Sequence, residues 1–147
     1  MQQDEDSPLK AEPVRILLVD VHAISRDSSR MLLDTMPDFE VVGETGDHNE
    51  AMRLAESLKP DVVIVSMRVE GSNGPDTTRD LIKLDPSIKV IFWTLFDDPE
   101  HVNNALKSGA SAYVLKQDPA SEVERAIEKV LNGFTYLSPT LKFIVQD

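Results

Sequence analysis

The sequence predicts an α/β protein in which a parallel sheet is covered on both faces by helices. Five short segments rich in apolar residues alternate with five segments of helical spacing, and the connections between them are short. This alternation is typical of parallel sheets built from strand-helix-strand units. At 147 residues, the chain is long enough for one such domain with a substantial core. We therefore expect a flavodoxin-like (βα)5 three-layer sandwich with the strand order 2-1-3-4-5.

The expected strands are short and rich in β-branched and other apolar residues, as strands buried on both faces are. Phe92 and Trp93 form an unusual aromatic pair within one of them. We expect these two side chains on opposite faces of the sheet, because side chains alternate along a strand. Packing against helices is the favoured interpretation of both, and contact with a ligand is the alternative. The five segments are VRILLV (14–19), FEVVGE (39–44), DVVIVS (61–66), KVIFWT (89–94) and SAYVLK (111–116).

The first two helices follow the first two strands. Residues 26–36 carry apolar residues at helical spacing, which predicts an inward face formed by Met31, Leu32 and Met36. In the next helix, Asp47 is the expected N-cap and Glu50 occupies the capping-box position. The apolar face of this second helix follows the i, i+3, i+4, i+7 pattern. Its members are Ala51, Leu54, Ala55 and Leu58.

The last three helices are bounded by typical capping residues. The third is expected over residues 74–84. Asp98 and Asp118, each followed by proline, are expected as the N-caps of the fourth and fifth helices. Gly109 and Gly133 are expected to end these two helices. The predicted inward residues of the fifth helix are Val123, Ala126, Ile127, Val130 and Leu131.

Composition excludes several classes of protein. With no cysteine, the chain has no disulfide, thiolate metal site or cysteine nucleophile. A net charge of −11 would repel phosphate backbones, so direct DNA contact by this chain is not expected. The sequence has no apolar stretch of the roughly 18 residues that a membrane helix needs, and it has no signal-peptide pattern, which favours the cytoplasm. Residues 1–13 are polar and acidic and are expected to form a disordered leader.

Several phrases agree in order and spacing with one known family. ILLVD, VIVS, FWT and AYVLK follow one another along the chain, together with MPDFEVVGE, LKPDVV, ALKSGASAYVLK and GFTYLSP. These phrases resemble the receiver domain of two-component response regulators, and especially the receivers of NarL/LuxR-type transcription factors. The resemblance covers residues 14 to about 139. It favours a receiver-like domain over 14–133, followed by 134–147 as a linker or the start of a missing output domain.

The resemblance implies a phosphorylation switch at the carboxyl ends of the strands. In the family, two adjacent acids after the first strand and an aspartate ending the third bind Mg²⁺, and that aspartate takes a phosphoryl group from a histidine kinase. A Thr or Ser ending the fourth strand and a Lys ending the fifth then bind the phosphoryl oxygens, while an aromatic on the fifth strand turns inward. The corresponding residues here are Asp20, Val21, Ser66, Thr94, Tyr113 and Lys116.

Two of these positions depart from the family pattern. Val21 stands where the second acid is expected, and Ser66 stands where the phosphoacceptor is expected. One carboxylate, from Asp20, leaves Mg²⁺ under-neutralised. A serine hydroxyl without an activating base is a poor nucleophile, and its phosphate ester would be inert beside an acyl phosphate. We therefore predict no metal, no cofactor and no enzymatic activity, with Ser66 as a degenerate phosphoacceptor position that hydrogen-bonds locally.

The remaining pocket residues have simpler interpretations. Lys116 is expected to form an ion pair with Asp20 that offsets its charge, and Thr94 is interpreted as a β-branched strand end. Tyr113 is interpreted as a partly buried packing aromatic rather than a moving switch. Leu95 is expected to narrow the entrance to the pocket.

These observations favour a phosphorylation-independent module for dimerisation or protein interaction that acts in transcription regulation. Its expected partner is a second copy of the chain or another protein. DNA would be bound only through an output domain absent from this chain, and no membrane contact is expected. Small-molecule sensing in the former phosphate pocket is the alternative, and conventional phosphotransfer is a third. The interface candidates are mixed in charge, and a solvated face is the other interpretation of the same residues. They are His101, Asn104, Lys107, Glu122, Arg125, Glu128 and Lys129.

Overall fold

Six parallel strands form one sheet in the order β2-β1-β3-β4-β5-β6 in the computed structural model, which describes residues 12–141. The predicted order 2-1-3-4-5 is confirmed, and one further strand extends the sheet beyond β5. The strands are β1 (Val14–Val19), β2 (Phe39–Thr45), β3 (Val62–Val65), β4 (Lys89–Thr94), β5 (Ala112–Leu115) and β6 (Tyr136–Leu137).

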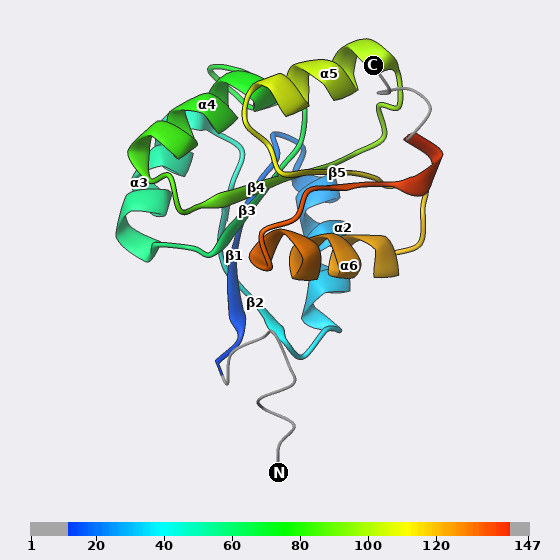
Figure 1. Ribbon diagram of the computed structural model, residues 1–147. Coiled ribbons are helices and arrows are strands. Elements are labelled where there is room, and N and C mark those ends of the chain that lie inside the picture. The colour runs from blue at the N-terminus through cyan, green and yellow to red at the C-terminus, as the bar shows by residue number, and fades with distance from the viewer. Residues whose placement is uncertain (1–11, 142–147) are drawn as a thin grey trace.

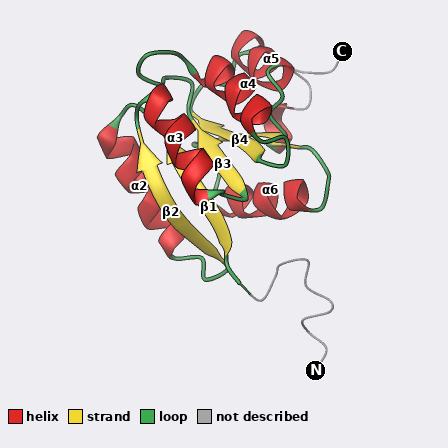
Figure 2. Cartoon of the chain, turned by 90° about the vertical axis from the view of Figure 1, so that its left-hand side faces the viewer, coloured by secondary structure: helices red, strands yellow, loops and turns green. Residues whose placement is uncertain are grey.

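Helices cover both faces of this sheet, which confirms the three-layer sandwich (Figure 1). α3, α4 and α5 pack on one face, and α2 and α6 pack on the other (Figure 2). None of the helices between residues 12 and 141 is long and apolar enough to cross a membrane. The helices are α2 (Ala23–Asp34), α3 (His48–Leu58), α4 (Gly74–Leu84), α5 (Pro99–Lys107) and α6 (Ser121–Leu131), and a short 3-10 helix, η1 (Pro139–Leu141), follows β6.

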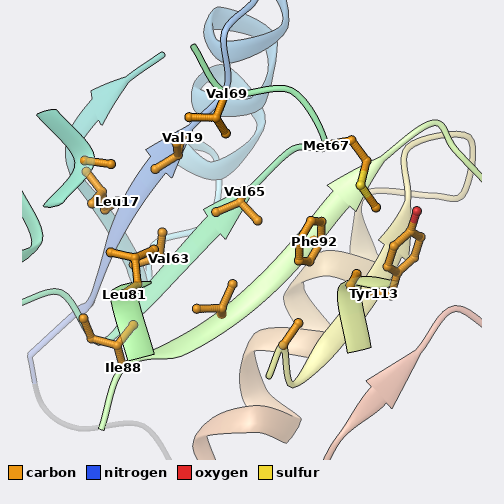
Figure 3. Packing of buried hydrophobic residues seen from close by; sticks show 14 of the residues in the cluster. Leu17, Val19, Val63, Val65, Met67, Val69, Leu81, Ile88, Phe92 and Tyr113 are labelled. Atoms are coloured by element: carbon orange, nitrogen blue, oxygen red, sulfur yellow. The ribbon is translucent and has the colours of Figure 1, made fainter. Parts of the chain in front are cut away.

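Alternation along the strands divides the core into two clusters. Phe92 belongs to the cluster under α3, α4 and α5, which includes strand residues and Leu81 of α4 (Figure 3). Trp93 belongs to the opposite cluster, with Leu33 of α2 and Val123 of α6. The expectation that Phe92 and Trp93 face opposite sides is therefore confirmed, and both side chains are buried.

Side-chain caps fix the starts of α3 and α5 as expected. The Asp47 carboxylate accepts a 2.9 Å hydrogen bond from the backbone N–H of Glu50, and the Asp98 carboxylate accepts one of 3.2 Å from the N–H of His101. The reciprocal half of the predicted capping box is wrong. The Glu50 carboxylate instead accepts a 2.5 Å hydrogen bond from the Thr45 hydroxyl, because that hydroxyl lies at the end of the adjacent strand β2.

The predicted inward face of the first helix is wrong for Met31 and Leu32, whereas Met36, just beyond the end of α2, is partly buried and packs against the core. Met31 and Leu32 are 70% and 41% exposed, and the residues of α2 that are buried are Ser29 and Leu33. α2 begins at Ala23, three residues before the predicted start, and its phase turns Ser29 and Leu33 toward the sheet. Ser29 can be buried because its hydroxyl accepts a hydrogen bond from the far side of the pocket, as described below.

The last helix begins later than predicted. Asp118 is not its N-cap, because α6 starts at Ser121, with Ala120 in the N-cap position and no side-chain capping bond. The N–H of Asp118 donates to the carbonyl of Leu115 in a turn after β5. One carboxylate oxygen of Asp118 is buried without a hydrogen-bond partner among the described residues.

Part of the segment expected to be a linker packs on the domain. β6 pairs with β5, and the Ser138 hydroxyl accepts a 3.0 Å hydrogen bond from the N–H of Leu115. Leu141 is buried in the core. The domain thus extends past the predicted boundary at residue 133, because a two-residue strand leaves no alternating pattern in the sequence. Residues 1–11 of the predicted leader, and residues 142–147, lie outside the described part of the chain.

Candidate functional site

The carboxyl ends of four strands meet at one pocket. β1 lies between β2 and β3, and β3, β4 and β5 follow in register. This arrangement brings Asp20, Ser66, Thr94 and Lys116 to the walls of a single cavity of about 360 Å³. The structure therefore places together four of the six residues that the sequence singled out, as open α/β sheets do with the loops that follow their strands, whereas Val21 and Tyr113 are not part of this lining.

Ser66 is held by local hydrogen bonds. Its hydroxyl donates to the carbonyl oxygen of Arg68 at 3.1 Å, and its N–H donates to the carbonyl of Val19 at 3.0 Å. The same Arg68 carbonyl also accepts the N–H of Val21 at 3.2 Å, so both of its lone pairs are used. In residues 12–141, neither an imidazole nor a carboxylate accepts the Ser66 proton.

Asp20 is a buried carboxylate with neighbours from its own loop. Its Oδ1 atom accepts a 2.9 Å hydrogen bond from the N–H of His22, and the His22 ring nitrogen Nδ1 lies 3.6 Å away. The Arg26 guanidinium donates to the backbone carbonyl of Asp20 at 2.7 Å and pairs with Glu44 at 3.3 Å. A cation of the chain itself therefore lies beside this loop.

Lys116 does not form the predicted ion pair. Its Nζ donates to the hydroxyls of Ser25 at 2.7 Å and Ser29 at 3.1 Å, and it lies 5.2 Å from the centre of the Trp93 ring. Within the described residues, no carboxylate is within 4.0 Å of this ammonium group. Burial lowers the pKa of Lys116, and the negative charge of Asp20 opposes that shift.

The two serines were not predicted as pocket residues. They lie four positions apart on α2, so both hydroxyls turn toward the sheet on one face of the helix. A pair of small hydroxyl residues at this spacing was the available signal. It does not identify its partner, because Lys116 is 91 residues from Ser25 along the chain.

Thr94 and Tyr113 are both tied to Phe96 in the loop after β4. The Thr94 hydroxyl oxygen accepts the N–H of Phe96 at 3.3 Å. The Tyr113 hydroxyl donates to the carbonyl oxygen of Phe96 at 2.7 Å. Tyr113 is fully buried, more so than predicted, and its ring stacks on Phe92 with the centroids 5.8 Å apart (Figure 3). Burial raises the pKa of Tyr113, and Asp98 and Asp97 add to the effect.

Apolar side chains form much of the pocket wall. Leu95 is 66% exposed and lines the cavity together with Met67, Trp93 and Phe96. The expected narrowing of the entrance by Leu95 stays a prediction. The polar part of the lining comprises Asp20, His22, Ser25, Ser66, Arg68, Thr94 and Lys116.

The interface candidates of α5 lie on its solvent-facing side. His101 bonds to the Asp98 carboxylate through Nδ1 at 2.7 Å and stacks on the Phe96 ring at 4.3 Å between centroids. Asn104 and Lys107 are exposed. Hydrogen bonding to His101 lowers the pKa of Asp98. These three candidates are therefore accessible to a partner, although His101 is already engaged on one side.

The candidates of α6 lie near β6. The Glu122 carboxylate accepts a hydrogen bond from the Tyr136 hydroxyl, and the Lys129 ammonium lies 5.5 Å above the ring of Phe134. Arg125 is exposed, while Glu128 is half-buried and its pKa is raised, first by burial and then by Glu124 and Asp38. The α6 candidates thus form a surface of mixed charge that already has internal contacts.

One Thr-His-Asp row lies outside the pocket. His48 contacts the Thr77 hydroxyl through Nδ1 at 2.8 Å and the Asp80 carboxylate through Nε2 at 3.2 Å. Such a row can activate a hydroxyl nucleophile, but Thr77 is fully buried and no substrate reaches it. The row joins α3 to α4 and has a structural role.

Comparison with known proteins gives the family. Residues 16–128 match the family of the response regulator receiver domain. The chain is 35% identical over 126 residues to the transcriptional regulatory protein DegU of Brevibacillus brevis, covering 86% of this chain and 53% of that protein. It is 33% identical over 130 residues to the nitrate/nitrite response regulator protein NarL of Escherichia coli K12, covering 88% and 60%. The chain thus spans a little over half the length of these relatives.

Solved structures agree with this assignment. A two-component response regulator of the LuxR family from Aurantimonas sp. SI85-9A1 superposes with a TM-score of 0.85 at 32% identity, covering 91% of this chain and 96% of that one. The isolated REC domain of RcsB from Salmonella enterica serovar Typhimurium shares the fold, with a TM-score of 0.82 at 20% identity over 92% of this chain and 100% of that one. The chain belongs to the response regulator receiver domains of the NarL/LuxR type.

Proposed function

We propose that this receiver domain works without an aspartyl-phosphate step, as a dimerisation or protein-interaction module of a transcription regulator. The observation that carries the proposal is Ser66. It occupies the position at which the family resemblance places the phosphoacceptor, and its hydroxyl is tied to the carbonyl oxygen of Arg68. The hydroxyl proton therefore has a partner that cannot act as a base.

The residues at the pocket do not fit Mg²⁺. This ion needs oxygen ligands in a near-octahedral array and is usually bound through carboxylates. Asp20 is the one carboxylate among the residues that line the cavity, and Val21 has no ligand atom in its side chain. The Arg68 carbonyl already accepts two hydrogen bonds. No group of three or more potential metal ligands occurs in the described residues.

The position of Tyr113 supports a constitutive rather than a switched module. The resemblance implies that an aromatic of the fifth strand turns inward when the domain is activated. Here the Tyr113 side chain is buried and its hydroxyl is hydrogen-bonded to the carbonyl of Phe96. The surface beside it, formed by α5, β5 and α6, would then keep one shape and be ready to bind a partner.

A second copy of the chain or another protein is the proposed partner at that surface. The exposed candidates Asn104, Lys107 and Arg125 combine amide and basic groups, which can form reciprocal contacts across a two-fold axis. DNA would be reached only through an output domain outside this chain. A size-exclusion measurement with light scattering, with and without Arg125→Glu, tests this surface through the molecular mass.

Phosphotransfer is tested directly by incubation with acetyl phosphate and Mg²⁺, followed by intact-mass measurement. We expect no added phosphoryl group on the wild-type chain. The variant Val21→Asp/Ser66→Asp restores both acids and is the matched positive control. A hydroxylamine-labile mass increase on the wild type would contradict the proposal.

Small-molecule sensing is the second candidate function. The observation that favours it is the cavity of about 360 Å³, which falls in the size range of small-ligand sites. A ligand that binds the folded state must raise the melting temperature by mass action, so thermal-shift measurements separate the two candidates. If the chain forms a stable dimer and no ligand raises its melting temperature, the interaction module is the one candidate function that remains.

A further inference from the structure

Two adjacent cavities that share part of their lining, together called the groove, lie at the carboxyl edge of the sheet. The first is the cavity of about 360 Å³ next to Lys116. The second, of about 560 Å³, lies between the start of α4 and α5. Both are lined by Met67, Arg68 and Phe96. The groove is therefore longer than the pocket at Ser66, and its size suits an organic molecule rather than a single small ion.

The shared part of the groove is apolar and partly aromatic. Met67 and Phe96 lie where the two cavities meet, and Trp93 and Leu95 extend the apolar wall toward Lys116. Leu95 is the most exposed of these side chains. A flat apolar body laid along this wall would remove that surface from water, which favours binding in proportion to the area covered.

The cationic side chains of the lining favour an anion. An ammonium group has three N–H donors, and Lys116 uses two of them on Ser25 and Ser29, which leaves one for a ligand. Arg68, which lines both cavities, is exposed, and its guanidinium forms no ion pair within 4.0 Å among residues 12–141. Asp20 is the single acid in this cavity, and one of its oxygens already accepts the N–H of His22.

We propose that the groove binds an amphipathic organic anion, with its apolar body against Trp93, Leu95 and Phe96 and its anionic group at Lys116 and Arg68. The assignment rests on the second candidate function and names the class of its ligand. The lining of the cavity next to Lys116 holds two cations, Lys116 and Arg68, against one carboxylate, Asp20, in a chain whose net charge is −11.

An occupant of the groove would contact the residue that links the pocket to the interaction surface. The Phe96 carbonyl holds the Tyr113 hydroxyl, and the Phe96 ring stacks on His101 of α5. A ligand packed on Phe96 would stabilise this arrangement of Tyr113 and α5 over any other. Binding in the groove and association through α5 would then be coupled, because each favours the same conformation.

The sole tryptophan of the chain provides the test, because Trp93 lines the groove. The probe is 8-anilino-1-naphthalenesulfonate, an aromatic anion that accepts energy from tryptophan. N-phenyl-1-naphthylamine has nearly the same rings without the charge, and inorganic phosphate has the charge without the rings. We expect saturable binding of the sulfonate with energy transfer from Trp93, a higher melting temperature, and binding at least roughly tenfold weaker for each of the other two probes.

Charge variants complete the test. Lys116→Met and Arg68→Met are each expected to weaken sulfonate binding roughly tenfold, whereas Lys83→Met, on the exposed end of α4, leaves it unchanged. Circular dichroism checks that each variant is folded. If Lys116→Met does not fold, Arg68→Met decides the outcome. Equal binding of the uncharged probe, unchanged binding by the charge variants, or no saturable binding would overturn the assignment.

These outcomes are independent of the phosphotransfer experiment. If acetyl phosphate does not phosphorylate the chain and the sulfonate does not bind, the ligand assignment is wrong, and the proposed phosphorylation-independent role still stands. If the chain acquires a hydroxylamine-labile phosphoryl group, the proposed function is wrong, regardless of whether the sulfonate binds.

Discussion

The Tyr113 hydroxyl donates a 2.7 Å hydrogen bond to the carbonyl oxygen of Phe96. The bond joins β5, at the centre of the proposed interaction surface, to the loop that follows β4 and lines the pocket. Tyr113 itself is fully buried, so the bond is made away from bulk water. Its contribution to stability and to the alkaline behaviour of the domain can be measured.

Replacing Tyr113 by phenylalanine removes this bond and keeps the ring stacked on Phe92. We expect a loss of about 1 kcal/mol in the free energy of unfolding, because the Phe96 carbonyl loses its partner. Urea denaturation of the two proteins gives the difference. Tyr136→Phe is the comparison, since Tyr136 is only half-buried, and a larger loss there than at Tyr113 would contradict the assignment.

Stability is expected to fall at alkaline pH. The pKa of Tyr113 is raised above its ordinary value by burial, and that of Tyr136 is raised to about 12 by burial and by Glu122. The folded state therefore retains protons that the unfolded state releases above pH 10, and stability is lost as the pH rises from there. Tyr113 alone contributes a slope of up to about 1.4 kcal/mol per pH unit.

Lys116 acts in the opposite direction, because burial lowers its pKa and the unfolded state then binds the extra proton. The contribution of this group to stability rises with pH until the pH passes about 10.5, which is the pKa of a lysine in the unfolded chain. The tyrosine effect is therefore measured most cleanly above pH 10.5, by urea denaturation of the wild type and of Tyr113→Phe. An equal alkaline slope in both proteins would count against the role of Tyr113.

The phase of α2 can be checked with a matched pair of substitutions. Leu33 is fully buried, whereas Met31 is 70% exposed. Leu33→Ala is expected to cost about 2–5 kcal/mol through lost burial and a cavity. Met31→Ala should lie within about 0.5 kcal/mol of the wild type. Equal costs at the two positions, measured by denaturant unfolding, would restore the inward face that the sequence predicted.

The segment after α6 is expected to contribute to stability. Leu141 is buried, and Ser138 accepts the N–H of Leu115 in the edge region of the sheet. Leu141→Ala should cost about 2–5 kcal/mol, and Ser138→Ala about 1–3 kcal/mol, because a buried N–H then lacks a partner. Thr140→Ala, at an exposed position of the same segment, is the control. Wild-type melting temperatures for all three variants would mean that this segment is a linker after all.

The sequence predicts the sheet well because each strand is a compact apolar segment with a clear position in the alternation. It predicts the phase of α2 badly, because Met31, Leu32 and Leu33 are consecutive apolar residues and any of them can face inward. The burial of Ser29 decides the matter, and that burial depends on a bond to Lys116, 87 residues away.

The site shows the same division between local and distant information. The meeting of Asp20, Ser66 and Thr94 at one cavity follows from the strand order alone. The partner of Lys116 does not follow from the strand order. Opposite charge favours Asp20 as its partner, whereas the structure provides two hydroxyls on α2. Likewise, Asp118 before proline is a typical helix start, yet the chain uses it in a turn.

The bonds from Lys116 to Ser25 and Ser29 have a mechanical consequence. They fasten the end of β5 to the first helix across the floor of the cavity, so that α2 cannot tilt away from the sheet without breaking two bonds. Forces applied to either element by a bound protein are transmitted to the other directly. The domain should then respond to its neighbours as a rigid unit, with its motions confined to the loops above that floor.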